Sequence, residues 1–294
     1  MTERNQISRS STPTAGAPGT PMEQGRSELT PEAKAALPHP NKPDTGSLGT
    51  PTLGARVDPE QDQTAAADAV RDMFSSIAPR YDLLNHVLSL NVDRYWWWRT
   101  ARRFRHILRR PDSRVLDLCC GTGDMTLALY RQAGVGGASI VGADFAHPML
   151  CRAVRKSVGL PLQWVEADAL QMPFADCRFH LVTSAFGFRN LANYEAGLRE
   201  IHRVLAADGE VAILDFGEPR GLPGKLYRFY FRRVLPAIGS LISGTRGPYA
   251  YLPASVARFP QPQEMLALMK ASGFREAAYT PYTFGVAGVY WGRK

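Results

Sequence analysis

Cysteine is scarce in this sequence, with four residues among 294: Cys119, Cys120, Cys151 and Cys177. No two of them have the C-x-x-C spacing of a zinc or redox site, and so few in a chain of this length exclude a disulfide-stapled fold. We expect four reduced thiols. We expect no metal, because the sequence contains no cluster of ligand residues with suitable spacing.

Long apolar runs are also lacking. No uncharged apolar stretch reaches the roughly 18 residues of a membrane-spanning helix, and the longest, residues 234–245, contains a proline and two glycines. The first residues have no apolar core typical of a secretory signal, and acidic residues such as Glu3 and Glu23 do not fit a mitochondrial presequence. We therefore expect a cytoplasmic protein.

Aromatic and branched aliphatic residues are nearly missing from residues 1–65, which are rich in Pro, Gly, Ser and Thr. Such a segment cannot bury enough apolar surface to offset the entropy of ordering it, which predicts a disordered tail. It holds 6 of the 35 basic and 8 of the 27 acidic residues, which leaves 29 basic and 19 acidic residues for the rest. Acidic charge is thus scarce in the part that folds.

Hydrophobic periodicity predicts structure from about residue 66 onward. Helical spacing over 66–77 and 93–108 predicts an N-terminal helical lid, residues 66–110, before a larger domain, residues 111–294. In the second of these helices we expect an apolar stripe made of Trp97, Ala101, Phe104 and Leu108.

From residue 114, short apolar runs alternate with helical patterns. We expect strands at 114–118, 139–143, 162–166, 179–184 and 210–216, and helices near 125–132, 149–157 and 194–205. Segments 275–284 and 286–292 predict a closing antiparallel hairpin joined through Gly285. This alternation predicts an α/β fold with a doubly wound, mostly parallel seven-stranded sheet covered on both faces.

The strongest local motif is the run VLDLCCGTGD, from Val115 to Asp124, which predicts a buried strand, a small-residue turn and a helix. Gly121 and Gly123 allow the backbone to approach a ligand, and the helix start suits an anion. A dinucleotide site would prefer G-x-G-x-x-G, whereas this turn has one G-x-G and an acid, Asp117, four residues earlier. That favours S-adenosylmethionine, with Asp117 near its amino group and the loop amides near its carboxylate. A structural loop without a ligand is the alternative.

Acidic residues also end the next two strands. Asp144 can accept hydrogen bonds from both ribose hydroxyls, and Asp168 can accept from an adenine amino group. The alternatives are a helix N-cap for Asp144 and a plain turn residue for Asp168. Because parallel strands end at one edge of a sheet, we expect the glycine turn and both acids to meet there.

Further runs resemble a known family. Residues 74–85 (FSSIAPRYDLLN), 186–190 (FGFRN) and 248–255 (PYAYLPAS) are similar to the ubiquinone/menaquinone biosynthesis C-methyltransferases, which are class I S-adenosylmethionine methyltransferases. The resemblance covers about residues 66–294 and implies Rossmann-like methylation of a ring carbon in a polyprenyl quinol. It implies cofactor contacts at Thr122, Asp144, Asp168 and Ala169. This chain has Ala185 where the family often has a serine that contacts the cofactor.

The resemblance also implies that Arg189 lies beside the reacting ring, where a guanidinium can stabilise a forming phenolate. The alternative is a surface or ion-pairing residue. Asn190 is expected to help orient a water molecule or the phenolate. We expect Tyr81 to face the cationic sulfur, and Asn85, Phe186 and Tyr251 to contact the substrate.

Two segments, residues 94–110 and 225–233, combine arginines with aromatics and predict peripheral docking at the inner membrane face. The alternatives are core-facing aromatics beneath a solvated arginine face, or nucleic acid, which we do not expect as a partner. A homodimer is left open. The competing functions are methylation of another small molecule or a nucleic acid, an NAD-dependent oxidoreductase, and a non-catalytic protein that kept the fold.

Overall fold

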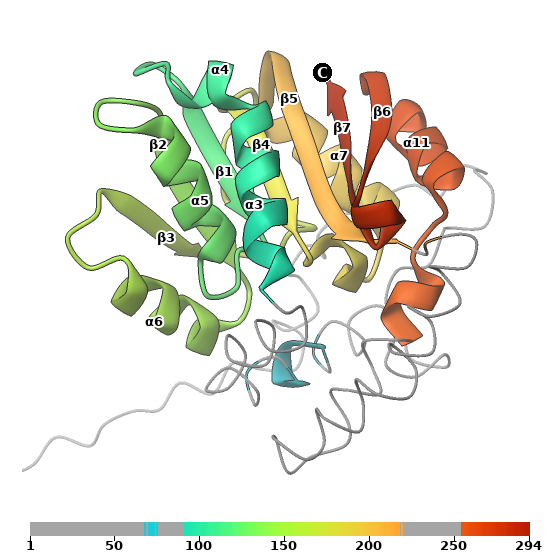
Figure 1. The fold of residues 1–294 in the computed structure, drawn as a ribbon, viewed down its shortest axis with the longest axis horizontal. Coiled ribbons are helices and arrows are strands. Elements are labelled where there is room, and N and C mark those ends of the chain that lie inside the picture. Colours follow the sequence, from blue (N-terminus) through green and yellow to red (C-terminus); the bar gives the residue numbers. More distant parts are fainter. Residues whose placement is uncertain (1–67, 69, 74, 76–90, 218, 220–253) are drawn as a thin grey trace, which may run out of the picture. The chain divides into compact units, whose positions relative to one another are not determined.

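The computed structural model describes residues 68, 70–73, 75, 91–217, 219 and 254–294. These residues form a seven-stranded sheet with the strand order β3-β2-β1-β4-β5-β7-β6 (Figure 1). The first five strands in this order are parallel, β7 is antiparallel to β5, and β6 is antiparallel to β7. The predicted α/β fold is therefore confirmed. The predicted tail lies outside the described residues, and the division between lid and larger domain stays a prediction.

The strands lie close to their predicted positions. They are β1 (Arg114–Leu118), β2 (Ser139–Asp144), β3 (Leu162–Glu166), β4 (Phe179–Ala185), β5 (Leu205–Phe216), β6 (Arg275–Tyr282) and β7 (Ala287–Arg293). Strand β5 begins five residues earlier than predicted, at Leu205. The hairpin turn is the short 3-10 helix η5 (Thr283–Gly285), in which Gly285 has a positive φ of 89°.

Alternate residues of the central strands pack into two separate cores. Leu116 and Ile213 belong to the cluster that also holds the apolar face of α7 (Tyr194–Val204), while Val115 and Leu214 belong to the cluster on α5 (Asp124–Ala133). Side chains of a strand alternate between its two faces, so the sheet is buried on both sides. This burial explains why the strands appear in the sequence as nearly continuous apolar runs.

The helix expected over 93–108 is broken. It forms α3 (Val92–Arg103) and α4 (Arg105–Leu108), separated by Phe104 with φ −97° and ψ 20°. Ala101, Phe104 and Leu108 are buried as expected. Trp97 is half-buried and packs against the same core, while Trp96, one residue earlier, is fully buried and its Nε1 donates to Thr283 Oγ1 over 2.8 Å.

The remaining helices are α6 (His147–Lys156), η3 (Phe188–Asn190) and α11 (Pro262–Ala271), and residues 70–73 and 254–258 are also helical. The sequence analysis assigned no helix to α11, in which the Glu264 carboxylate accepts from the Gln261 amide over 3.0 Å at the N-terminus. All four cysteines are free thiols, as expected. Among the described residues, no helix has the length and apolar content to span a bilayer.

Candidate cofactor and substrate site

A cavity lies at the carboxyl ends of the parallel strands, where the strand order reverses between β1 and β4. Open α/β sheets bind ligands at such a point, because the loops there diverge to opposite faces. Four loops contribute lining residues, after β1 (119–122), β2 (144–145), β3 (167–170) and β4 (185–187). The structure thus brings together the glycine turn and both strand-end acids.

The two glycines of the turn have different surroundings. Both have positive φ, 55° at Gly121 and 86° at Gly123. A Cβ at Gly121 would meet no atom within 4 Å, so the space beside this backbone is open. A Cβ at Gly123 would lie 2.6 Å from Cη2 of Trp164, whose ring also fills the space beside Gly142. Gly121 therefore leaves room for a ligand, whereas Gly123 leaves room for a tryptophan.

A lysine on α6 holds the end of this turn. Lys156 Nζ donates to Asp124 Oδ1 over 2.6 Å and to Thr122 Oγ1 over 3.1 Å. Thr122 is buried and lines the cavity together with Asp124. The interaction fixes the first turn of α5 against α6, and with it the backbone amides that face the cavity.

Asp117 lies at the bottom of the cavity and is fully buried. Its two carboxylate oxygens accept hydrogen bonds from the hydroxyls of Thr126, over 2.6 Å, and Thr183, over 2.7 Å. Burial raises the pKa of Asp117 to about 7, although both hydroxyls lower it. The group is therefore poised to ionise when a cation arrives, as expected of a residue that attracts an ammonium group.

Asp144 joins the end of β2 to the glycine turn. Its Oδ2 accepts from the Gly121 amide over 2.8 Å, and its Oδ1 accepts from the Ala146 amide over 2.9 Å at the start of α6. Burial raises the pKa of this carboxyl, and these amides oppose the shift. A carboxylate has about four acceptor positions, so the two amides leave capacity for ribose hydroxyls.

The loop after β3 carries Asp168 and Ala169 on the cavity wall. Asp168 is exposed, and its Oδ1 accepts from the Leu170 amide over 2.8 Å, which forms a local turn. This turn leaves the other carboxylate oxygen for a ligand. The cavity position agrees with the expected adenine contact, which stays a prediction.

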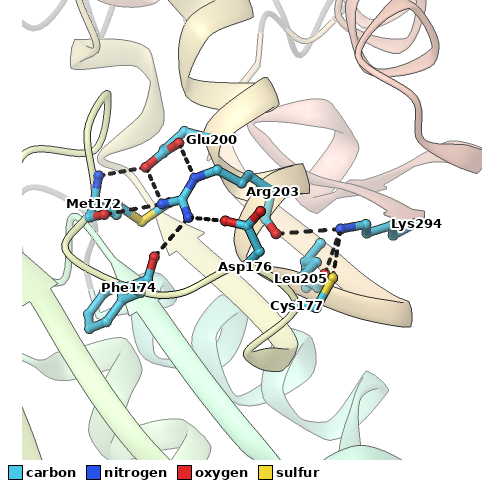
Figure 2. A network of polar contacts seen from close by, with 8 residues as sticks. All are labelled: Met172, Phe174, Asp176, Cys177, Glu200, Arg203, Leu205 and Lys294. Atoms are coloured by element: carbon cyan, nitrogen blue, oxygen red, sulfur yellow. Dashed lines mark hydrogen bonds and ion pairs between the residues drawn. The ribbon is translucent and has the colours of Figure 1, made fainter.

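A guanidinium on α7 fixes the rest of this loop. Arg203 donates to both carboxylate oxygens of Glu200, to Asp176, and to the backbone carbonyls of Phe174 and Met172, at 2.6–3.1 Å (Figure 2). Its five N–H donors thus all have partners. The segment leading from the cavity wall into β4 is therefore tied to α7.

The loop after β4 carries the predicted Phe186, Arg189 and Asn190. Phe186 and Asn190 line the cavity, and the Phe186 ring lies 4.5 Å from that of Phe216. Arg189 is not among the lining residues, because its guanidinium is buried in an ion pair with Asp215 at 3.0 Å. The predicted Tyr81, Asn85 and Tyr251 lie outside the described residues.

Several lining residues were missed by the sequence analysis. Trp97, Phe145, Met149, Cys119 and Arg71 all border the cavity. Phe145 directly follows Asp144, and the Arg71 guanidinium lies 5.4 Å from the centre of its ring. The only available signal for Phe145 was its position after a strand-end acid. Trp97 has helical spacing that fits a core position equally well.

The fold and this site define the class of protein. The structure is similar to a crystal structure from Thermotoga maritima described as a SAM-dependent methyltransferase, possible histamine N-methyltransferase. The TM-score is 0.51 at 17% identity, covering 76% of this chain and 99% of that chain. The sheet order with its antiparallel β7 is thus that of S-adenosylmethionine-dependent methyltransferases.

Sequence comparison identifies the family. A profile of the ubiE/COQ5 methyltransferase family matches residues 61–294, and the chain belongs to this family. It is 50% identical to the demethylmenaquinone methyltransferase of Thermus thermophilus, over 75% of this chain and 99% of that protein. It is 44% identical to the ubiquinone/menaquinone biosynthesis C-methyltransferase UbiE of Geobacter sulfurreducens, over 79% of this chain and 90% of that protein.

Proposed function

We propose that this protein transfers the methyl group of S-adenosylmethionine to a ring carbon of a polyprenyl quinol precursor. The product is menaquinol from demethylmenaquinol, or the equivalent benzoquinol in ubiquinone synthesis. The observation that carries the proposal is one cavity lined both by the glycine turn with Asp117 and Asp144 and by the FGFRN loop. The names of the family relatives support the same reaction.

The residues present fit the cofactor. The backbone at Gly121 faces open space, Asp117 is a buried carboxyl able to pair with an ammonium, and Asp144 keeps free acceptor positions. Phe145 and Ala169 supply apolar walls on the adenine side of the cavity. When bound there, S-adenosylmethionine supplies an electrophilic methyl group on a sulfonium.

The chain's own residues have three tasks in this reaction. The quinol ring must be held with its carbon about 3–3.5 Å from the methyl group. Trp97 and Phe186 provide apolar surface in the cavity that packs against a ring and excludes water. The Asn190 amide orients the phenol oxygen or a water molecule that takes its proton. We also propose that Tyr81, Asn85 and Tyr251 complete the site.

Transfer of labelled methyl groups tests the proposal. The purified protein, with S-adenosylmethionine labelled on its methyl group, is given reduced demethylmenaquinol or the benzoquinol precursor, each in detergent. We expect label on the ring carbon of one of them, and none with Asp144→Ala. The absence of transfer to either quinol, with transfer to an RNA or to a soluble phenol, would contradict the proposed substrate.

We further propose that α3 docks on an anionic membrane, where a polyprenyl quinol resides. Tyr95 and Trp98 are 48% and 44% exposed and stack with 5.9 Å between ring centres, and the Arg102 guanidinium lies 5.4 Å from the Trp98 ring. Aromatic rings favour the interfacial layer and arginines favour anionic headgroups. Trp96 is buried in the core and takes no part. The second predicted segment, 225–233, lies outside the described residues.

Vesicle flotation tests this docking. Full-length protein should float with vesicles containing anionic phosphatidylglycerol and should float less with neutral phosphatidylcholine. Trp98→Ala and Arg102→Gln should each reduce the floated fraction. The matched controls are Val158→Ala, another exposed apolar residue, and Arg131→Gln, an exposed arginine on α5. The proposed surface would be refuted if the controls reduced the floated fraction as much as the α3 variants do, or if the α3 variants did not reduce it.

A further inference from the structure

The FGFRN loop is fastened to the sheet at two places: the Phe186 amide donates to the Leu214 carbonyl of β5 over 2.8 Å, and a buried carboxylate of β5 holds Arg189. Asp215, near the end of β5, is fully buried, and the side chain of Arg189 is 5% exposed. Asp215 Oδ1 accepts from the Arg189 guanidinium over 3.0 Å, and Oδ2 accepts from the Arg189 backbone amide over 3.1 Å. The Asp215 carboxylate thus binds both the guanidinium and the backbone amide of Arg189.

Arg189 makes further hydrogen bonds. The Arg189 guanidinium also donates to the backbone carbonyl of Phe186, and the Tyr194 hydroxyl donates to the Arg189 carbonyl over 2.9 Å. Asp215 Oδ1 in turn accepts from the Phe216 amide over 2.9 Å. These contacts tie both ends of the loop to β5 and α7.

We infer that the Arg189–Asp215 pair acts as a clamp that sets the position of Phe186 and Asn190 against the substrate ring. Asp215 is thereby a positioning residue for methyl transfer, and Arg189 acts through the loop and not by contact with the ring oxygen. The inference rests on the proposed function, and it changes the role that the sequence analysis expected for Arg189.

Two observations support a positioning role for the Arg189–Asp215 pair. Phe186 has a positive φ of 57°, a strained conformation for an aromatic residue that persists only where its surroundings hold it. Asp215 offsets the guanidinium charge at 3.0 Å, and neither residue lines the cavity, so the guanidinium is not a free cation beside the ring. A clamp fits both observations, whereas a direct charge on the phenolate would require Arg189 to leave a buried partner.

Three variants test the clamp: Asp215→Asn, Arg189→Met, and the double variant, which removes both charges and so avoids an uncompensated buried ion. A misplacement of about 1 Å costs on the order of 100-fold in turnover, and we expect each single variant to lose about that much in kcat. The double variant should lose no more than either single one. The KM for S-adenosylmethionine and the pH profile of kcat should change little.

Hydrogen exchange gives a readout that needs no substrate. Amides of peptides covering residues 186–190 should exchange faster in all three variants, while those of β1 remain protected. The matched control is Asp112→Asn, which removes a carboxylate from an exposed ion pair with Arg110 before β1. It should change neither kcat nor the exchange rate of residues 186–190. A wild-type protein inactive on quinols would contradict the proposed function and leave the exchange result as a separate test of the clamp.

Three results would overturn the inference. One is an Asp215→Asn protein that keeps wild-type turnover while Arg189→Met loses it. Another is unchanged exchange at residues 186–190 in the single variants. The third is recovery of Arg189→Ala turnover on adding methylguanidine, because a mobile cation can replace a charge but cannot replace a clamp.

Discussion

The hydroxyl of Thr126 donates a 2.6 Å hydrogen bond to Asp117 Oδ2, which ties the first turn of α5 to the end of β1. The partner of the second oxygen is Thr183 on β4. Three elements therefore meet at one buried carboxyl, whose pKa burial raises to about 7. Its charge state near neutral pH depends on what occupies the cavity.

Cofactor affinity should therefore depend on pH. Below pH 7 Asp117 in the free protein is mostly protonated, and an ammonium group beside it favours the carboxylate, so binding releases a proton. We expect affinity for S-adenosylmethionine to rise with pH up to about 7 and then to level off. Titration calorimetry at pH 6 in two buffers of different ionisation enthalpy measures the released proton, and Asp117→Asn should abolish it.

Folding stability should depend on pH in the opposite direction to cofactor affinity: it should fall as pH rises. Because the folded pKa of Asp117 lies above its ordinary value of 3.8, the group's contribution to stability is fully present below that value and is lost as pH rises through about 7. Asp117→Asn should flatten this part of the stability curve in urea unfolding at pH 5 and pH 8. An identical curve for the variant would assign the titration to another group.

Asp144→Ala should abolish detectable cofactor binding. It removes the proposed ribose acceptor and also frees the amides of Gly121 and Ala146, and hydrogen bonds to a charged acceptor contribute roughly 1.5–3 kcal/mol each. Asp144→Asn keeps one acceptor oxygen and should weaken binding less. Titration calorimetry and thermal unfolding separate the two effects, and near-native affinity of the alanine variant would refute the ribose assignment.

Gly121→Ala and Gly123→Ala form a matched pair. Both place a side chain at positive φ, which costs roughly 1–2 kcal/mol. Only the Gly123 variant also forces a Cβ to 2.6 Å from Trp164. We expect Gly121→Ala to weaken cofactor binding more than stability, and Gly123→Ala to lower the unfolding temperature further. Equal losses of stability would show that the tryptophan moves aside at little cost.

Arg203→Ala should lower stability by about 2 kcal/mol, because it leaves two carbonyls without their donor and removes the guanidinium from Glu200, which keeps the Met172 amide. It should also weaken cofactor binding through the loop that carries Asp168 and Ala169. Arg203→Lys should recover only part of the loss, since an ammonium lacks the planar fork. Arg199→Ala, which breaks an exposed 3.6 Å pair with Glu195 on the same helix, is the control and should cost less than about 1 kcal/mol. Unchanged cofactor affinity in Arg203→Ala would contradict the coupling.

Most of the sheet could be predicted because strands buried on both faces appear as apolar runs. Helix α11 was not predicted, although Pro262 stands in its first turn, where proline is tolerated. Trp97 was assigned to the core from its helical spacing, and it packs there only in part because Trp96, one residue earlier on α3, takes the fully buried position.

The sequence predicts those parts of the candidate site that lie at the carboxyl ends of strands. Asp144 and Asp168 each follow a strand, so topology alone places them at one edge. The partner of Arg189 was not predictable, because Asp215 lies 26 residues further along the chain. Only the pairing of β4 with β5 brings the two together. The sequence therefore favoured a chemical role for Arg189 over the alternative of an ion pair, which is what the fold contains.

The Trp164 ring occupies the space that side chains at Gly123 and Gly142 would need, and its Nε1 donates to Ser157 Oγ over 3.0 Å. Gly123 belongs to the glycine turn, Gly142 to β2 and Trp164 to β3, yet the side chains of all three positions compete for the same space. Among related chains positions 142 and 164 should covary: a small residue at 164 would leave room for alanine at 142, while a retained tryptophan would demand glycine there, and position 123 should stay glycine in both cases because its φ is positive.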